Sequence, residues 1–153
     1  IENEMFSCCH SLESIIIPDS VESIGPNAFY DCSKLKRIAL PANLKSIYWC
    51  TFPWTGLKVI YIPKSVETIY CDAFYGTNIS YVYYGGSEEQ FNSINFGENN
   101  SKLKSAKIHY NEKLVEIDGV VYSEDMSTIV ACSNQKSDSF VMLSSVNAAS
   151  LPE

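Results

Sequence analysis

The sequence predicts a solenoid of stacked coils that is β-rich with short helical turns, and two observations lead to this fold class. The first is a repeat of 22 to 23 residues, and the second is a set of apolar positions that recurs within it. The fullest copy spans residues 24–46 and aligns with residues 1–23. Its recurring positions are Ile24, Phe29, Cys32, Leu35, Ile38, Leu40, Pro41 and Leu44, which match Ile1, Phe6, Cys9, Leu12, Ile15, Ile17, Pro18 and Val21. A period of this length is typical of solenoids, in which each coil contacts only its neighbours.

The repeat continues downstream with small changes of length. Residues 47–68 form a third copy, in which Gly56 marks a deletion of one residue, and a fourth copy starts at Ile69. One phenylalanine recurs in each coil at intervals of 23, 23 and 22 residues, and these are Phe6, Phe29, Phe52 and Phe74. We expect each ring to fill the interior of its own coil and to contact the ring of the next coil.

Each coil is expected to contain the same three short elements. Residues 12–18 predict a strand whose alternate residues point inward, and Pro18 ends it because proline has no N–H for a ladder. Residues 20–24 predict a second extended run on another side of the coil. A tight helical turn over residues 27–30, and over the equivalent residues of other coils, is expected to carry the phenylalanine.

The fourth coil departs from this pattern after its first strand. Ser87 and Gln90 have the spacing of a helix capping box, so residues 87–95 predict a short helical insertion. This insertion is expected to replace the second extended run. The inward pattern then resumes as a fifth strand, whose inward residues are Leu103, Ala106 and Ile108.

The pattern of the sequence changes from residue 112 onward. Two β-rich runs, 117–123 and 128–132, flank a short polar stretch and predict a hairpin. Residues 140–146 repeat the strand pattern of the coils, so a further repeat is expected to begin there. We therefore interpret residues 1–111 as coils, and residues 112–153 as a hairpin segment and the start of another repeat, continuous with the same solenoid.

Charge and motifs disfavour several functions. The formal net charge is −7, which argues against nucleic acid as a partner. No run of 18 apolar residues is present, so no membrane insertion is expected for this segment. No hydrolase, phosphate-loop or metalloprotease motif occurs, and we expect neither enzyme activity nor a cofactor. Cys8, Cys9 and His10 are adjacent in sequence, which is not the spacing of zinc ligands, so no metal site is expected.

The cysteines permit two interpretations. Cys9 and Cys32 occupy one repeat position, at which the next two coils carry threonine. A position that accepts either residue favours a small buried group with a weak donor, so free thiols are expected there. Cys50 and Cys71 would lie diagonally on adjacent coils, and a disulfide between them is left open.

The recurring motif resembles a known family. Residues 28–47 match the pattern AF-x-x-C-x-x-L-x-x-I-x-[IL]-P-x-[SN]-[VL]-x-x-I and look like the BspA-type leucine-rich repeat. Residues 83–111 resemble the insertion of many bacterial members, and residues 118–132 resemble that family's hairpin. The resemblance implies a leucine-rich-repeat right-handed solenoid in a non-catalytic protein. It also implies an extracellular or cell-surface location, with adhesion or binding to a host or bacterial surface protein.

The outward columns of the stacked strands are the expected binding surface. Equivalent residues on stacked strands lie about 4.8 Å apart, so the tyrosines of neighbouring coils predict a contiguous aromatic patch. This patch consists of Tyr61, Tyr81 and Tyr83 with Val59, and the basic residues expected around it are Arg37, Lys36, Lys58, Lys104 and Lys107. The repeat spacing places Lys107 beside Tyr83. Tyrosine and arginine are enriched at binding hot spots, which favours this surface for a protein ligand.

Two other interpretations remain open from the sequence. Strands favour tyrosine and valine by propensity alone, in which case the chain would be a structural spacer within a longer surface protein. Trp49, Trp54 and Tyr48 lie on expected turns, either as interior groups or as exposed groups on which a glycan stacks. The exposure of the three strand tyrosines separates the binding surface from the spacer.

Overall fold

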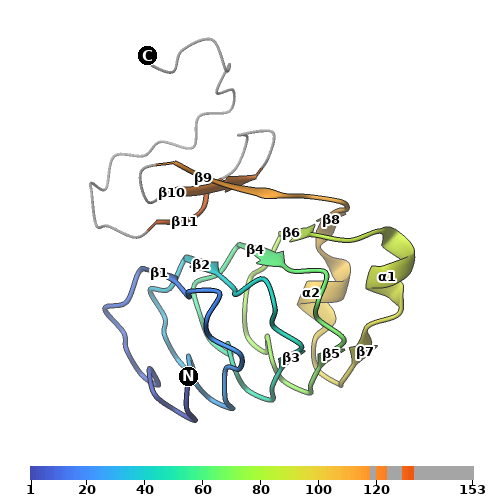
Figure 1. Ribbon diagram of the computed structural model, residues 1–153. Coiled ribbons are helices and arrows are strands. Elements are labelled where there is room, and N and C mark those ends of the chain that lie inside the picture. The colour runs from blue at the N-terminus through green and yellow to red at the C-terminus, as the bar shows by residue number, and fades with distance from the viewer. Residues whose placement is uncertain (118–119, 124–128, 133–153) are drawn as a thin grey trace.

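The computed structural model describes residues 1–117, 120–123 and 129–132, with side chains up to residue 113. The chain winds into successive coils that lie side by side, so that like segments of neighbouring coils are stacked (Figure 1). Short parallel strands recur along the stack, which is the repeat-based, β-rich architecture that the sequence predicts.

The first strand of each coil contributes to one long face of the stack. Its elements are β1 (Ser14–Ile16), β2 (Arg37–Ala39), β4 (Val59–Ile62), β6 (Tyr81–Tyr84) and β8 (Lys107–His109). All pairings along this row are parallel, with β1 bonded to β2 and with β6 bonded to both β4 and β8. Ile15 lies opposite Ile38 and Ile60 lies opposite Val82, so the register of the first four coils follows the repeat as predicted.

A second row of strands runs along another side of the coils. It consists of β3 (Ser46–Ile47), β5 (Thr68–Ile69) and β7 (Asn95–Phe96), paired in that order. Ile69 lies opposite Phe96, although the helix α1 (Glu88–Asn92) has been inserted between the two rows in this coil. The prediction that the insertion replaces the second extended run is therefore wrong, because the chain returns to the sheet after the helix.

The inserted helix α1 begins as predicted. The Ser87 hydroxyl accepts a hydrogen bond from the Gln90 backbone amide at 3.3 Å, and the Gln90 side-chain oxygen accepts one from the Ser87 amide at 2.9 Å. This reciprocal pair is a complete capping box. Phe91 is buried on the inner side of the helix, where its ring contacts the edge of Tyr84 at 5.2 Å between centroids.

The fifth strand differs from its prediction. A second helix, α2 (Ser101–Ser105), occupies the first half of the expected strand and buries Leu103 against the core. Only residues 107–109 remain as β8, and the register shifts by two residues. Lys107 lies opposite Tyr81, and His109 takes the predicted place of Lys107 opposite Tyr83.

The predicted hairpin is present in the described residues. β10 (Val120–Ser123) and β11 (Ile129–Cys132) pair antiparallel, and β9 (Leu114–Ile117) pairs with the other side of β10. This small sheet lies above the first row of strands, where β11 contacts β1, β2 and β4 (Figure 1). The further repeat expected at 140–146 lies outside the described residues.

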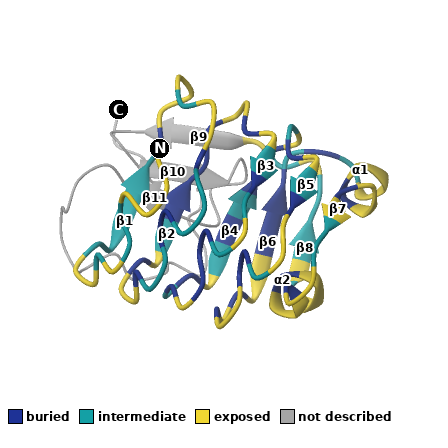
Figure 2. Cartoon of the chain, turned by 90° about the horizontal axis from the view of Figure 1, so that it is seen from below, coloured by how far each residue is buried: buried dark blue, intermediate teal, exposed yellow. Residues whose placement is uncertain are grey.

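The core is a stack of phenylalanine rings inside the coils. Phe29, Phe52 and Phe74 are at most 1% exposed, whereas Phe6 in the first coil is partly buried. Successive ring centroids lie 5.2, 5.4 and 5.3 Å apart, with the planes close to parallel. Buried residues dominate the strands of the middle coils, and exposed residues gather on the turns and helices (Figure 2).

The turns that carry these phenylalanines are not helical, contrary to the prediction. Each ring is flanked by residues with left-handed backbone angles, such as Asn27 at φ 55° and Asp31 at φ 52° around Phe29. The residues in the two flanking columns are Glu4, Asn27, Cys50 and Asp72 before the ring, and Cys8, Asp31, Trp54 and Gly76 after it. Five of these eight residues are asparagine, aspartate, glycine or cysteine in a conformation that glycine, asparagine and aspartate adopt most readily.

This backbone conformation directs amides toward the next coil. The amides of Asn27, Phe29 and Asp31 donate to carbonyl oxygens of Trp49, Thr51 and Pro53 at 3.4, 3.0 and 3.0 Å. The amide of Phe6 donates to Ala28 and that of Phe52 to Ala73, both at 2.9 Å. A column of backbone hydrogen bonds thus runs from coil to coil through the phenylalanine turns.

Asn100 takes over this column at the fourth coil. Its side-chain oxygen accepts the amide of Phe74 at 3.1 Å, in place of the carbonyl that the next coil supplies elsewhere. Its side-chain nitrogen donates to the carbonyl oxygens of Tyr70, Gly97 and Glu98 at 2.8 to 3.2 Å. Asn100 is 2% exposed, so these bonds replace water for groups that the insertion would otherwise leave unpaired.

We expect Phe29→Ala and Phe52→Ala each to lower the free energy of unfolding by about 3–5 kcal/mol, because a buried ring is lost from between two others. Phe6→Ala should cost clearly less, since Phe6 stacks on one described ring and is partly exposed. Urea midpoints of the three variants measure the difference. Equal losses at all three positions would contradict a stack of coupled coils.

Asn100→Ala should lower the free energy of unfolding by at least about 2 kcal/mol, because a buried amide and several carbonyls lose their partner. Asn43→Ala, at an exposed turn, serves as the control and should change stability by less than about 0.5 kcal/mol. Thermal and urea unfolding of both variants provide the comparison. A loss at Asn100 no larger than that at Asn43 would show that the side chain does not continue the ladder.

Candidate functional site: the strand face and an aromatic edge

The strand face is the outward side of β4, β6 and β8. Val59, Tyr81 and Lys107 lie side by side across it, one residue from each strand. Tyr61, Tyr83 and His109 form the next column along the same strands. The structure therefore brings together the three tyrosines as predicted, but adds His109, which the sequence analysis did not include.

The second column is partly covered. Tyr83 is only 6% exposed, and its ring stacks on His109 with 4.8 Å between centroids. Tyr61 is half-buried, and its hydroxyl donates to the backbone oxygen of Glu112 at 3.4 Å. The expectation of an open three-tyrosine patch is wrong for Tyr83, because residues 109–112 and the β9–β11 sheet pass over this side of the face.

Tyr81 remains the open aromatic group of the strand face. Its side chain is 42% exposed, and Lys58 and Lys107 on either side are also exposed. The backbone of Tyr81 is anchored to the neighbouring coil, where its amide donates to the carbonyl of Lys58 at 3.2 Å. An aromatic ring held on a rigid strand between two ammonium groups suits a ligand that offers both an apolar contact and carboxylates.

The other predicted basic residues separate into two groups. Lys36 is exposed next to β2, and Arg37 on β2 is half-buried, with its Nε atom buried and without a hydrogen-bond partner in the described part of the chain. Lys104 lies on α2 instead of the strand face, and its ammonium group sits 4.9 Å from the centre of the Phe96 ring. Lys104 is therefore excluded from the predicted patch, because α2 replaces the strand on which it was placed.

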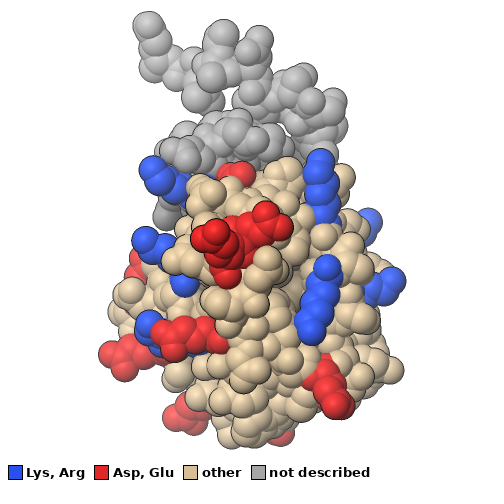
Figure 3. Space-filling model, turned by 90° about the vertical axis from the view of Figure 1, so that its right-hand side faces the viewer, with Lys and Arg blue, Asp and Glu red and all other residues tan. Residues whose placement is uncertain are grey.

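Electrostatics in the covered column favour neutral groups. Burial raises the pKa of Tyr61, and the nearby carboxylate of Glu112 raises it further. The phenol consequently stays protonated at neutral pH and remains a donor to the backbone. At the end of the molecule formed by α1 and β7, acidic and basic side chains are interspersed, so no single sign dominates that end (Figure 3).

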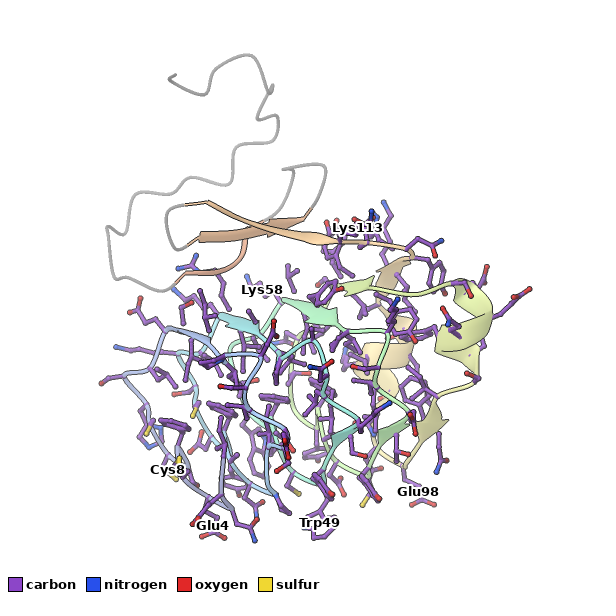
Figure 4. The ribbon with its side chains drawn as sticks, in the orientation of Figure 1. Glu4, Cys8, Trp49, Lys58, Glu98 and Lys113 are labelled. Carbon is purple, nitrogen blue, oxygen red and sulfur yellow. The ribbon has the colours of Figure 1, made fainter. Side chains whose placement is uncertain are left out.

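A second aromatic surface lies on the opposite edge of the coils. Tyr48 and Tyr70 follow β3 and β5, and their rings stack with 5.3 Å between centroids and planes 2° apart. Trp49 contacts both tyrosines edge-on and is 46% exposed. Figure 4 shows Trp49 at the lower edge of the coils and Lys58 near the upper side, so the two surfaces face different directions.

Glycine opens a groove beside this aromatic group. Gly25 precedes Tyr48 by one coil, and a side chain there would meet the backbone nitrogen of Asn3 at 2.8 Å. The missing side chain leaves an open groove of about 630 Å³ whose lining residues are Ile1, Glu2, Asn3, Ser23, Gly25, Pro26, Tyr48 and Trp49. The groove thus has aromatic rings on one side and polar side chains on the other.

The described cysteines are free thiols. Cys50 and Cys71 are not bonded to each other, which answers the alternative that the sequence left open. Cys32 is fully buried, and its thiol donates to the backbone oxygen of Phe6 at 3.0 Å. Burial raises the pKa of Cys32 to about 11, so it is an unreactive packing group. Cys9 is only partly buried, so the expected burial is met at Cys32 alone.

The fold and these surfaces define a class: a β-rich repeat protein whose coils leave aromatic groups on two exposed sides. Residues 1–128 match the family described as BspA type leucine rich repeat region, in six copies. The chain therefore belongs to this family. A comparison with curated proteins finds no match.

One solved structure resembles the chain in both sequence and fold. It is a leucine rich cell surface protein from Faecalibacterium prausnitzii, 28% identical, with a TM-score of 0.56. The similarity covers 62% of this chain and 32% of that protein, so it spans about a third of the neighbour's length. No helix in the described part of this chain is both long enough and apolar enough to span a membrane.

Proposed function

We propose that this chain is a non-catalytic binding module of a cell-surface protein, and that it holds an acidic protein partner on the open part of its strand face. The observation that carries the proposal is Tyr81, 42% exposed on a rigid strand and bordered by Lys58 and Lys107. Its location and its adhesive role are inferred from the family and from the cell-surface neighbour. The stacked coils would form a right-handed solenoid, as in the leucine-rich repeats that the sequence resembles.

Charge supports this choice of surface. The chain carries a formal net charge of −7, yet the side chains around Tyr81 are cationic. A local positive patch on an acidic protein orients an acidic partner toward that patch and raises the rate of association. Tyr81 would supply the apolar contact at the centre, as tyrosine often does in binding hot spots.

The proposal predicts that beads coated with the chain adhere to cultured epithelial cells through a protein receptor. Tyr81→Ala combined with Lys58→Glu and Lys107→Glu should reduce bound beads about tenfold or more, since a hot-spot tyrosine and two attractive charges are lost. The matched control is Tyr75→Ala with Lys102→Glu and Lys113→Glu, which changes residues of the same types away from Tyr81. Circular dichroism must confirm that both variants fold.

Treatment of the cells separates the kinds of partner. Protease treatment of the cell surface should abolish bead binding if the receptor is a protein. Wild-type and strand-face variant beads that bind equally well would contradict the proposal. No adhesion by either protein, in an assay that detects a known adhesin, would favour the structural-spacer interpretation.

A second candidate function is glycan binding in the Gly25 groove. The ring face of Tyr48 that points away from Tyr70 borders the space left by Gly25, and Glu2 and Asn3 line the same groove. Sugars are bound in this manner by an aromatic face together with carboxylate and amide groups that accept hydroxyl hydrogen bonds. The specific observation in its favour is that an aromatic cluster and polar groups line one groove.

The glycan alternative makes a distinct prediction. Trp49→Ala should abolish binding to a glycan array, whereas Trp54→Ala should not, because Trp54 is equally exposed but does not line the groove. Bead adhesion that is lost after glycosidase treatment and retained after protease treatment would assign the function to the groove. Array binding that is equal in wild type and Trp49→Ala would eliminate it.

A further inference from the structure

A cluster of metal-ligating side chains lies on the surface of the first two coils. Cys8 and Asp31 occupy equivalent repeat positions one coil apart, and His10 follows Cys8 by two residues. The thiol, one imidazole nitrogen and a carboxylate oxygen all lie within 4.8 Å of one another. Cys8 and His10 are exposed and Asp31 is half-buried, so an ion from solution has direct access to the cluster (Figure 4 labels Cys8).

The backbone holds these three side chains on one side of the molecule. Cys8 and Asp31 both have left-handed backbone angles, at φ 57° and 52°, because both belong to the column of turns that follows the stacked phenylalanines. The Cys8 amide donates to the carbonyl of Tyr30 at 2.7 Å, which joins the two turns. The Nδ1 atom of His10 lies 3.0 Å from the backbone oxygen of Asp31 and 3.9 Å from its carboxylate.

From this arrangement we infer a zinc site formed by Cys8, His10 and Asp31. Zinc takes thiolate, imidazole and carboxylate ligands at about 2.0–2.3 Å, so tetrahedral ligands lie about 3.3–3.8 Å from one another. Rotation of exposed side chains closes the remaining difference from the present separations. A water molecule would occupy the fourth position.

The ligand set selects among metals. A thiolate together with an imidazole suits zinc, whereas calcium and magnesium take oxygen ligands. The sequence analysis excluded zinc because it considered the adjacent Cys8, Cys9 and His10 alone. The third ligand, Asp31, comes from the next coil, at a separation of 23 residues that equals the repeat.

A metal at this position would join two coils. Two of its ligands belong to the first coil and one to the second, so the complete site exists only while the coils are stacked. Zinc would therefore bind the folded chain in preference to the unfolded chain and raise its stability in proportion to the logarithm of the free zinc concentration. The site is independent of the binding surfaces proposed above.

The test is a titration of the purified, reduced 153-residue chain with Zn²⁺ in a buffer without chelators, followed by calorimetry and by thermal unfolding. We expect one zinc ion per chain and a rise in Tm that increases with zinc concentration. Cys8→Ser, His10→Ala and Asp31→Asn should each weaken binding at least tenfold and remove the rise in Tm. Co²⁺ in place of Zn²⁺ should give a thiolate-to-cobalt absorption band that Cys8→Ser abolishes.

Two matched controls make the result specific. Cys9→Ser changes the adjacent thiol, and Cys71→Ser changes an exposed thiol elsewhere. Both variants should bind zinc as the wild type does. Loss of binding in either control with retention in Cys8→Ser would overturn the inference, as would wild-type affinity in Asp31→Asn. Absence of zinc binding to a wild-type chain with a normal unfolding transition would also overturn it.

Discussion

The structure depends on the backbone hydrogen bonds that pass from coil to coil at the phenylalanine turns. Each turn places residues on either side of its ring in a left-handed conformation, which costs about 1–2 kcal/mol for a residue other than glycine. The conformation directs amides such as those of Asn27 and Asp31 at carbonyl oxygens of the next coil. A buried amide without a partner would cost about 1–3 kcal/mol, so the strain is offset only while the coils remain stacked. Ring stacking and strand pairing follow from the same spacing.

Much of this fold could be predicted from the sequence, because repeat spacing determines which residues stack. The registers of the first four coils, the phenylalanine stack, the capping box at Ser87 and the β10–β11 hairpin all agree with the prediction. The left-handed turns were missed because Cys50 and Trp54 obscure the recurring asparagine, aspartate and glycine. The helix α2 was missed because Leu103 fits an inward strand position as well as a buried helix position. Periodicity cannot separate these two for so short a segment.

The candidate site was less predictable than the fold, because exposure depends on what covers a strand and not on the strand itself. Spacing correctly aligned Tyr61 with Tyr83, but it could not indicate that Tyr83 is buried against His109. Conversely, the stacked columns already contained the pairing of Cys8 with Asp31, which only a comparison between coils reveals. In repeat proteins, side chains that lie one period apart must therefore be examined together, since neighbours in sequence are often not neighbours in space.

Native-state hydrogen exchange tests the central role of the coil-to-coil bonds most directly. The amides of Phe29, Phe52 and Phe74 donate out of their own coil, to Thr51, Ala73 and the side chain of Asn100. The amide of Tyr30 instead donates to Asn27 within its own turn. We expect the three phenylalanine amides to exchange only through unfolding of the stack, and therefore far more slowly than that of Tyr30. Exchange of Phe29 and Phe52 at the rate of Tyr30 would contradict the account.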